Sequence, residues 1–182
     1  MRYRDQPTVQ VEERIAADPA EVWRLVTDIE IPPRFSAELQ RVEWLDGATE
    51  PAVGNRFQGH NQNPHLGEWS TVCEVTEVEP GRRWTWQVTH GANVMATWGF
   101  EVDPGREAVT VRQFARMGPD PSGLSIAIEA MPDKESRIVS RRMDEWRENM
   151  AANLRGIKAL AEGSGAGAAA RVEADGLGAD AG

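Results

Sequence analysis

The sequence contains little cysteine and tyrosine and has no excess of basic charge. Its 182 residues include one cysteine, Cys73, and one tyrosine, Tyr3. A single cysteine excludes an intrachain disulfide. Twenty Lys and Arg residues stand against 29 Asp and Glu residues, which gives a net charge of −9. Because no basic run could follow a phosphate backbone or an anionic lipid surface, we expect neither nucleic acid nor a membrane as a partner.

Long hydrophobic runs are also missing. The first 15 residues lack the continuous apolar stretch of a signal peptide, and no segment approaches the length of a membrane span. We therefore expect a cytoplasmic protein. His60, His65 and Glu68 surround a proline-containing turn but match no common metal-ligand spacing, so we expect no metal and no cofactor.

The N-terminal region predicts one strand followed by helical structure. Residues 8–15 alternate between apolar and polar side chains, as in a half-buried strand, with Glu13 as the discordant inward position. Asp18 is the expected N-cap of a helix whose first position is Pro19. A short second helical turn, interrupted by prolines, is expected near Phe35.

From residue 41 to residue 118 the pattern predicts six consecutive antiparallel strands, separated by turns rich in Gly, Pro and Asp. A long amphipathic helix is then expected from about residue 133 to residue 161, with apolar side chains at steps of three and four. Residues 163–182 are rich in Gly and Ala without an apolar period, which predicts a disordered tail. The chain is thus expected to form a single domain over residues 1–162.

Five segments of the chain carry a family resemblance: VEERIAADPAEVWRLVTDIEIPPRF (11–35), VEWLDG (42–47), VGNRFQGHNQ (53–62), GEW (67–69) and VTEVEPGRRWTWQV (75–88). They resemble the helix-grip superfamily of START and birch-allergen-like proteins, and most of all its branch of polyketide cyclase/dehydratase-like proteins. The resemblance covers residues 9 to about 160. It implies an α+β helix-grip fold, in which a seven-stranded curved antiparallel sheet wraps around a long C-terminal helix and two short helices follow the first strand.

The resemblance also implies a deep cavity between the sheet and the last helix, which would hold a hydrophobic or polycyclic ligand. Gly59 and Asn61 share one face of a strand with Phe57, where a packed core would require bulky apolar groups. They would suit a pocket with a few polar contacts. Alternatively, Gly59 marks a bulge that bends the sheet, and Asn61 lies at a wet rim.

Large side chains on the strands and on the last helix are candidates for contact with such a ligand. Tryptophan provides flat apolar surfaces and an indole N–H, and methionine adapts to irregular shapes. The alternative for each of these side chains is ordinary core packing. The candidates are Phe57, Trp69, Trp86 and Trp98 on the strands, with Met143, Trp146 and Met150 on the helix.

Candidates for catalysis are few. Glu13, if it is buried, would be an acid or base with a raised pKa, and Arg112 could polarise a ketone. The alternatives are an outward-turned Glu13 and an Arg112 on a solvent face. Cyclases of this superfamily are thought to use pocket Arg, Tyr and acidic groups, but Tyr3 precedes the first strand, so we expect no tyrosine deep in the cavity. A template mechanism would need fewer catalytic groups.

These observations leave three classes of function open. The first is an enzyme of the polyketide cyclase/dehydratase kind acting on a small hydrophobic ligand. The second is a carrier that binds or sequesters a lipid or metabolite without turnover. The third is a regulatory or co-chaperone-like interaction module, which would have a filled interior and an apolar exterior patch. The protein is expected to be a monomer or a homodimer.

Overall fold

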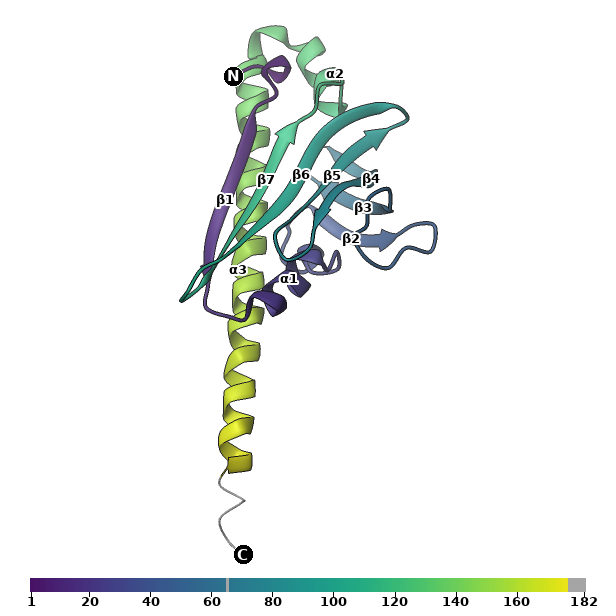
Figure 1. Cartoon of the computed structure of the whole chain (residues 1–182). Coiled ribbons are helices and arrows are strands. Elements are labelled where there is room, and N and C mark those ends of the chain that lie inside the picture. Colours follow the sequence, from purple (N-terminus) through teal and green to yellow (C-terminus); the bar gives the residue numbers. More distant parts are fainter. Residues whose placement is uncertain (65, 177–182) are drawn as a thin grey trace, which may run out of the picture.

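One curved antiparallel sheet and one long helix dominate the computed structural model, which describes residues 1–64 and 66–176 (Figure 1). The strands are β1 (Thr8–Ile15), β2 (Leu39–Trp44), β3 (Arg56–Asn63), β4 (Gly67–Glu79), β5 (Arg83–His90), β6 (Asn93–Pro104) and β7 (Val109–Met117). They pair antiparallel in the order β1-β7-β6-β5-β4-β3-β2. The seven strands and their direction confirm the predicted sheet.

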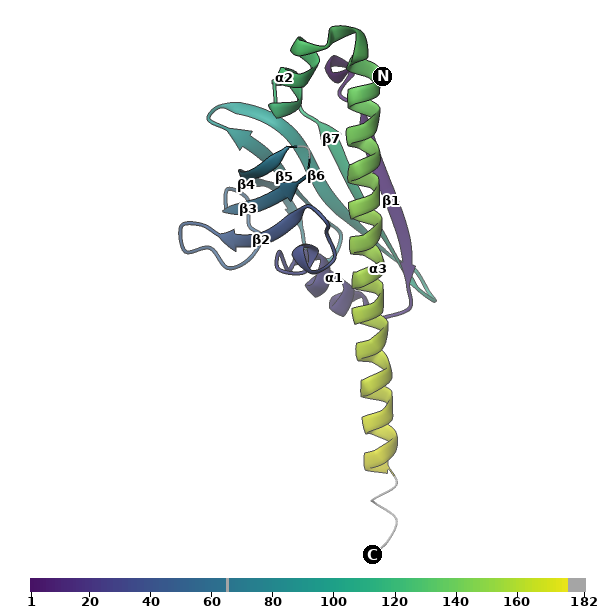
Figure 2. The same cartoon turned by 180° about the vertical axis from the view of Figure 1, so that it is seen from behind.

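The helices lie on the concave side and at the ends of this sheet. They are η1 (Tyr3–Asp5), α1 (Pro19–Thr27), η2 (Pro32–Arg34), α2 (Gly123–Ala130), η3 (Pro132–Lys134) and α3 (Glu135–Gly176). Seen from behind, α3 runs along the opening of the curved sheet, with α1 beside its middle and α2 beside its N-terminal end (Figure 2). The helix-grip arrangement is thus confirmed.

Helix α2 was not predicted from the sequence. Its segment is GLSIAIEA, in which only the serine and the glutamate are polar. It therefore shows no clear amphipathic period. Its start does carry a local signal, because the Ser122 side chain accepts a hydrogen bond from the backbone N–H of Leu124 at 3.3 Å. A serine before a short apolar run was the cue available in the sequence.

Helix α3 is longer than predicted. The sequence analysis placed its end near Ala161 and a tail after it, whereas the helix continues to Gly176 and projects beyond the sheet (Figure 1). Alanine has the highest intrinsic helix propensity, and this segment is rich in it. The remainder of the expected tail, residues 177–182, lies outside the described residues. Within the described ranges, no helix combines the length and the hydrophobicity that crossing a membrane requires.

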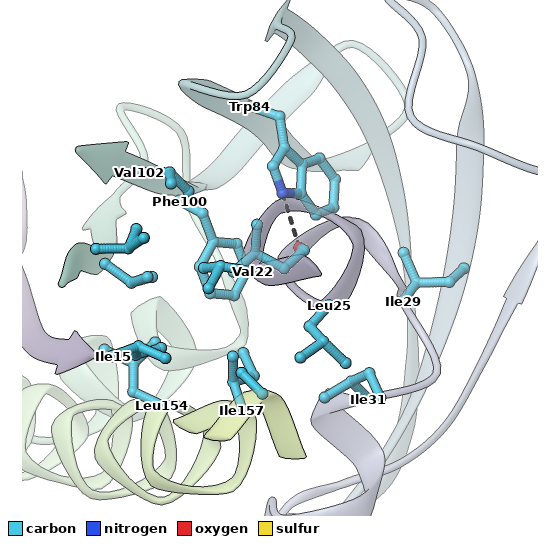
Figure 3. Close-up of a cluster of buried hydrophobic side chains, with 14 of the residues drawn as sticks. Ile15, Val22, Leu25, Ile29, Ile31, Trp84, Phe100, Val102, Leu154 and Ile157 are labelled. Carbon is cyan, nitrogen blue, oxygen red and sulfur yellow. Dashed lines mark hydrogen bonds between the residues drawn. The ribbon is translucent and has the colours of Figure 1, made fainter. Parts of the chain in front are cut away.

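The start of α1 follows its local sequence. Asp18 Oδ1 accepts hydrogen bonds from the backbone N–H groups of Ala20 at 2.8 Å and Glu21 at 3.4 Å, and Pro19 occupies the first helical turn. The other end of α1 is tied to the sheet, because the indole of Trp84 donates a 2.9 Å hydrogen bond to the carbonyl of Val26 (Figure 3). Helix α1 therefore has a fixed place under the sheet.

The core next to α1 consists of buried apolar side chains. Leu154 and Ile157 of α3 and Ile15 of β1 are each 0% exposed. They pack with side chains of α1 and with Phe100 of β6 (Figure 3). This half of the interior anchors α3 against the sheet and leaves the other half of the helix to cover the cavity described next.

Candidate functional site

A cavity of about 580 Å³ lies between the concave face of the sheet and the N-terminal half of α3. Its walls come from strands β2 to β7, from α2 and α3, from Val26 at the end of α1 with the segment that follows it, and from Tyr3 of η1. Eight of the nine predicted ligand-contacting residues line it, and most of its lining is apolar. These eight are Phe57, Gly59, Asn61, Trp69, Trp86, Trp98, Trp146 and Met150.

Gly59 helps to keep this space open on strand β3. A Cβ at this position would lie 3.2 Å from the Leu39 side chain and 3.4 Å from the hydroxyl of Thr71. Both neighbours line the cavity, and the glycine lets them approach the strand while contributing no side chain of its own. The pairing of Gly59 with Thr71 is regular, so there is no bulge at this position.

Tryptophan rings form much of the cavity wall. Trp84 and Trp86 on β5 have ring centroids 4.4 Å apart, and Trp98 on β6 meets Trp146 on α3 at 4.9 Å. The second contact spans the space between sheet and helix. These rings offer broad, flat apolar surfaces of the kind that suits another ring system.

An ion pair closes the cavity between α3 and the segment before β2. Arg142 donates two hydrogen bonds of 2.6 Å to the two carboxylate oxygens of Glu38, and a third of 3.1 Å to Glu145. The side chains of Arg142 and Glu38 are 13% and 15% exposed. Burial by itself would lower the pKa of Arg142, but the Glu38 and Glu145 carboxylates outweigh it and raise the pKa above its ordinary value, so the guanidinium stays charged.

Aromatic rings flank the same guanidinium. The Arg142 guanidinium carbon lies 6.0 Å from the ring centroid of Trp69 and 5.5 Å from that of Trp146. These contacts fall within the range of cation–π attraction. The charged group therefore fixes two tryptophans of the wall as well as the loop that carries Glu38.

Asn149 makes a second polar closure one and a half to two turns further along α3. Its Oδ1 accepts hydrogen bonds from the backbone N–H of Ala37 at 2.9 Å and the hydroxyl of Ser36 at 3.2 Å. Its Nδ2 donates to the carbonyl of Glu145 at 3.0 Å. Through the two hydrogen bonds that its Oδ1 accepts, Asn149 clamps α3 to the segment before β2.

A buried amide pair lies deeper in the cavity. Asn153 of α3 donates a 3.0 Å hydrogen bond from Nδ2 to Oε1 of Gln113 on β7. Both residues line the cavity and are 2% and 5% exposed, respectively. Gln113 could have been found from the sequence, because it is the polar exception among the inward residues of β7. Asn153 lies among the buried apolar side chains of α3, and the sequence analysis did not name it as a site residue.

Two further titratable groups line the cavity. Burial raises the pKa of the Cys73 thiol to about 12, so the group is a neutral thiol at ordinary pH. The pKa of Tyr3 is also raised, chiefly by burial, and its hydroxyl donates a 2.8 Å hydrogen bond to the carbonyl of Asp120. The sequence analysis expected no tyrosine deep in the cavity. Tyr3 lines the cavity at its α2 end, where the N-terminal turn η1 lies.

Three predicted site residues lie elsewhere. Met143 packs in a separate core cluster with Val9 and Ala115 and does not line the cavity. Glu13 faces α3, where its carboxylate accepts a 3.4 Å hydrogen bond from Lys158, and it too is outside the cavity lining. The alternation of β1 located its face correctly, but the lysine that meets it is 145 positions away in sequence.

Arg112 lies on the convex face of the sheet. It is paired with Glu12 on the neighbouring strand, with its Nε 2.7 Å from the carboxylate. The inward residues of β7 are the odd-numbered ones, which are buried, whereas Arg112 belongs to the even-numbered set. The solvent-face alternative for Arg112 is therefore the one that the structure supports.

The histidines considered as metal ligands do not form a metal site in the described part of the chain. His60 lies on the outer face of β3 and contacts Arg41 at 2.9 Å and Glu43 at 3.1 Å. His65 lies outside the described residues. Among residues 1–64 and 66–176, no three His, Cys, Asp or Glu side chains come close enough together to hold a metal ion.

A family model described as "Polyketide cyclase / dehydrase and lipid transport" matches residues 6–162. The chain belongs to this family. No curated protein matches it significantly. The family assignment agrees with the resemblance found in the sequence and with the helix-grip fold.

Solved structures show the same architecture. A polyketide-cyclase-like protein of Corynebacterium glutamicum is 26% identical, with a TM-score of 0.60 over 85% of this chain and 91% of its own. The di-domain ARO/CYC StfQ of the steffimycin biosynthetic pathway is 19% identical, with a TM-score of 0.66 over 90% of this chain and 53% of its own. Major latex-like protein 151 of Panax ginseng is 12% identical, with a TM-score of 0.59 over 86% and 97%. The last two similarities establish the fold alone.

Proposed function

We propose that this protein encloses a small hydrophobic, ring-containing ligand of polyketide-like character in the cavity between sheet and α3. The observation that carries the proposal is the cavity itself, with about 580 Å³ of space walled by tryptophan rings. Binding sites for small molecules are typically concave, mostly apolar and provided with a few polar groups. The family description, which names cyclases, dehydrases and lipid transport, supports the same class of ligand.

The hollow interior favours a ligand-binding role over an interaction module. A module of that kind would be expected to fill its interior and to present an apolar patch outside. In this protein, side chains that would fill a core line an open space instead, and polar side chains such as Asn61 and Gln113 line it with them.

The cavity favours binding without turnover. Arg142 and Glu38 are occupied with each other, and the Cys73 thiol stays neutral because its pKa is about 12. Glu13 and Arg112, the predicted acid or base and carbonyl-polarising group, do not line the cavity. We therefore assign the protein the role of a carrier or sequestering protein, and give neither residue a catalytic part.

The test is a titration with N-phenyl-1-naphthylamine, a neutral apolar probe that becomes fluorescent in apolar surroundings. We expect saturable one-to-one binding accompanied by quenching of tryptophan emission. Gly59→Leu places a side chain in the cavity and should lower the affinity for the probe at least about tenfold. A tenfold loss corresponds to about 1.4 kcal/mol of binding free energy.

Gln58→Leu is the matched control, because it adds the same side chain at the neighbouring position, on the opposite face of β3. Its affinity should equal that of the unmodified protein. Absence of saturable binding, or an equal loss in both variants, would contradict the proposed cavity. Retained cooperative thermal unfolding in both variants shows that the comparison is between folded proteins.

A further inference from the structure

A small polar niche lies in the cavity wall over Gly59 of β3. A Cβ at this glycine would point into the cavity, as the Phe57 side chain two positions away does. It would lie 3.4 Å from Oγ1 of Thr71, the paired residue on β4, and 3.9 Å from Nδ2 of Asn61. Two polar atoms thus border the space that the missing side chain leaves free. We call this space the Gly59 niche.

Both polar groups of the niche are open to the cavity. Asn61 and Thr71 lie on the concave face of the sheet, line the cavity and are each partly exposed. By contrast, Trp146 Nε1 and Asn153 Oδ1, which lack a hydrogen-bond partner in the described part of the chain, are enclosed by protein. A molecule in the cavity can therefore contact the niche but not those two atoms.

The amide of Asn61 is left unused by the protein. Among the residues that the structure describes, its side chain makes no hydrogen bond. The other two asparagines of the lining are engaged, because Asn149 accepts from Ser36 and Asn153 donates to Gln113. An amide nitrogen carries two N–H donors. Asn61 Nδ2 can therefore donate a hydrogen bond to a molecule that reaches the Gly59 niche.

The hydroxyl of Thr71 provides a second donor. It interacts with the neighbouring Cys73 thiol, whose pKa burial raises to about 12, so the sulfur is not a charged acceptor at ordinary pH. A hydroxyl has one donor and two acceptor positions, and a thiol S–H is a weak donor. Thr71 can therefore accept from the thiol while its own O–H points to the niche. Two donors then border one space.

The surroundings of the two donors are apolar. The Leu39 side chain lies 3.2 Å from the position of a Cβ at Gly59. Trp69 is paired with Asn61 across β3 and β4, and it lines the cavity on the same face. Its ring offers a flat surface for another ring. The niche thus suits an acceptor oxygen attached directly to a ring system.

The nearby charges disfavour an anionic oxygen. Among the described residues that line the cavity, Arg142 is the one cationic side chain, and it is paired with Glu38 and Glu145. Glu38 directly precedes Leu39, and its carboxylate also accepts a 3.3 Å hydrogen bond from Asn63. A carboxylate in the niche would lose its hydration and lie near Glu38 without gaining a free cation. A neutral carbonyl oxygen avoids both costs.

From this arrangement we infer that the Gly59 niche binds the carbonyl oxygen of a neutral ring ketone, which accepts hydrogen bonds from Asn61 and Thr71. The ring of the ligand lies against Trp69. This inference rests on the proposed function, because it names the ligand chemistry of the same cavity. It distinguishes ring ketones from apolar rings without a carbonyl group and from fatty acids.

The test uses 6-propionyl-2-(dimethylamino)naphthalene, a neutral fluorescent ketone whose emission moves to longer wavelength when its carbonyl accepts hydrogen bonds. Its 6-propyl analogue keeps the frame and lacks the carbonyl oxygen. We expect the ketone to bind at least about tenfold more tightly, as two net hydrogen bonds would allow. The anionic fatty acid cis-parinarate should bind at least about tenfold more weakly than the ketone.

Two variants assign the carbonyl to the niche. Asn61→Leu and Thr71→Val remove the donors at similar side-chain volume. Each should reduce the ratio of ketone to propyl affinity by about 3- to 10-fold and move the emission of bound ketone to shorter wavelength. Affinity for the propyl analogue should stay within about twofold, since it makes no such hydrogen bond.

Matched controls make the same exchanges on the convex face of the sheet. Gln62→Leu lies next to Asn61 on β3, and Thr97→Val lies next to Trp98 on β6. Successive side chains of a strand point to opposite faces, so neither control reaches the cavity. Both should leave the affinity ratio and the emission of bound ketone unchanged.

The outcomes separate this inference from the proposed function. If the propyl analogue binds as tightly as the ketone, or if both variants keep the ratio and the emission, the carbonyl niche is wrong although the cavity still binds rings. A change in only one variant would overturn the role of the other residue. Equal or tighter binding of cis-parinarate would overturn the requirement for a neutral ligand.

The proposed function fails as well if neither naphthalene compound nor N-phenyl-1-naphthylamine binds saturably. Each affinity ratio is taken within one variant, so a general loss of stability does not mimic the expected pattern. The emission of bound ketone reports on the carbonyl itself, independently of affinity.

Discussion

The two ends of the space between the sheet and α3 differ in what fills them, although the same helix runs along both. At the filled end, next to α1, Leu154 and Ile157 are 0% exposed and pack into a continuous apolar core. At the hollow end, next to α2, the helix presents Arg142, Asn149 and Asn153 to the cavity. The two parts of α3 thus differ in polarity as well as in what they cover.

The two ends are also closed by different contacts. At the filled end, Phe35 lies directly on Gly156 of α3, where a Cβ would be 2.3 Å from the ring. At the hollow end, the segment before β2 is held to the helix by the Glu38–Arg142 pair and by Asn149. Apolar contact is lost when water enters, whereas polar groups can exchange their partner for water. We therefore expect the hollow end to be the one that opens to admit a ligand.

The largest expected effect is on the alkylation rate of Cys73, which belongs to the apolar core and also lines the cavity. Its pKa is raised from 9.0 to about 12, so the thiolate fraction near pH 8 falls about a thousandfold. Alkylation by iodoacetamide, followed by mass spectrometry, should be slower than in guanidinium-unfolded protein by at least this factor. Equal rates would mean that water reaches the boundary between the two ends.

The same thiol makes the free energy of unfolding depend on pH in the alkaline range. Because folding raises the pKa of an acid, the neutral form is favoured in the folded state, and this contribution to stability is complete below the pKa of the unfolded thiol. It is lost as the pH rises from about 9 toward about 12. Urea unfolding of Cys73→Ala should show a weaker decline over this alkaline range than the unmodified protein.

A second prediction concerns the ion pair of the hollow end. Glu38→Gln leaves the Arg142 charge without its bidentate partner, and we expect it to lower the free energy of unfolding by about 2–3 kcal/mol. The double variant Glu38→Gln/Arg142→Met should recover part of this loss, since no unpaired charge remains. Urea denaturation measures both.

Glu21→Gln on α1 is the matched control for that change. Glu21 pairs with Arg24 at 2.8 Å, and the Arg24 hydrogen bond lowers the pKa of Glu21, but the pair lies at the surface. Its loss should cost no more than about 0.5 kcal/mol. A similar cost for the two glutamates would contradict the view that Glu38 closes a buried site.

The smallest expected effect comes from adding side-chain volume at each end. Ala161 at the filled end is 1% exposed, and Ala96 at the hollow end is 5% exposed. Ala161→Leu overpacks a filled core and should destabilise the protein by about 1–2 kcal/mol. Ala96→Leu extends into the cavity and should change stability by less than about 0.5 kcal/mol while weakening binding of N-phenyl-1-naphthylamine. Equal destabilisation would mean that the two ends do not differ in packing.

Much of the fold could be predicted from local patterns. The strand alternation, the N-cap at Asp18 and the spacing of the turns depend on neighbouring residues, and the structure confirms them. Helix α2 and the continuation of α3 were missed because the first has no apolar period and the second has only its alanine content in its favour. The family resemblance, carried by the same segments, supplied the arrangement of sheet and helix.

The site divides along the same line. Strand and helix periodicity identified the inward faces, so Phe57, Asn61, Trp86 and the other lining residues were found from their positions in one element. The Glu38–Arg142 pair was missed, because its members are 104 positions apart and neither is unusual within its own segment. Glu13 does lie on the inner face, but its carboxylate accepts a hydrogen bond from Lys158 and does not line the cavity.

The sequence by itself determined the seven strands, helix α1 and most of α3, the side of each strand that faces inward, and the tryptophans on that side. Only the tertiary structure decided that the interior is filled at one end and hollow at the other, that Tyr3 returns to the cavity wall, and that Trp146 and Asn153 are left with free polar atoms. The physical reason is range. Periodicity and capping act between neighbours, whereas volume, charge pairing and hydrogen-bond satisfaction depend on side chains that meet only when distant strands and helices are packed together.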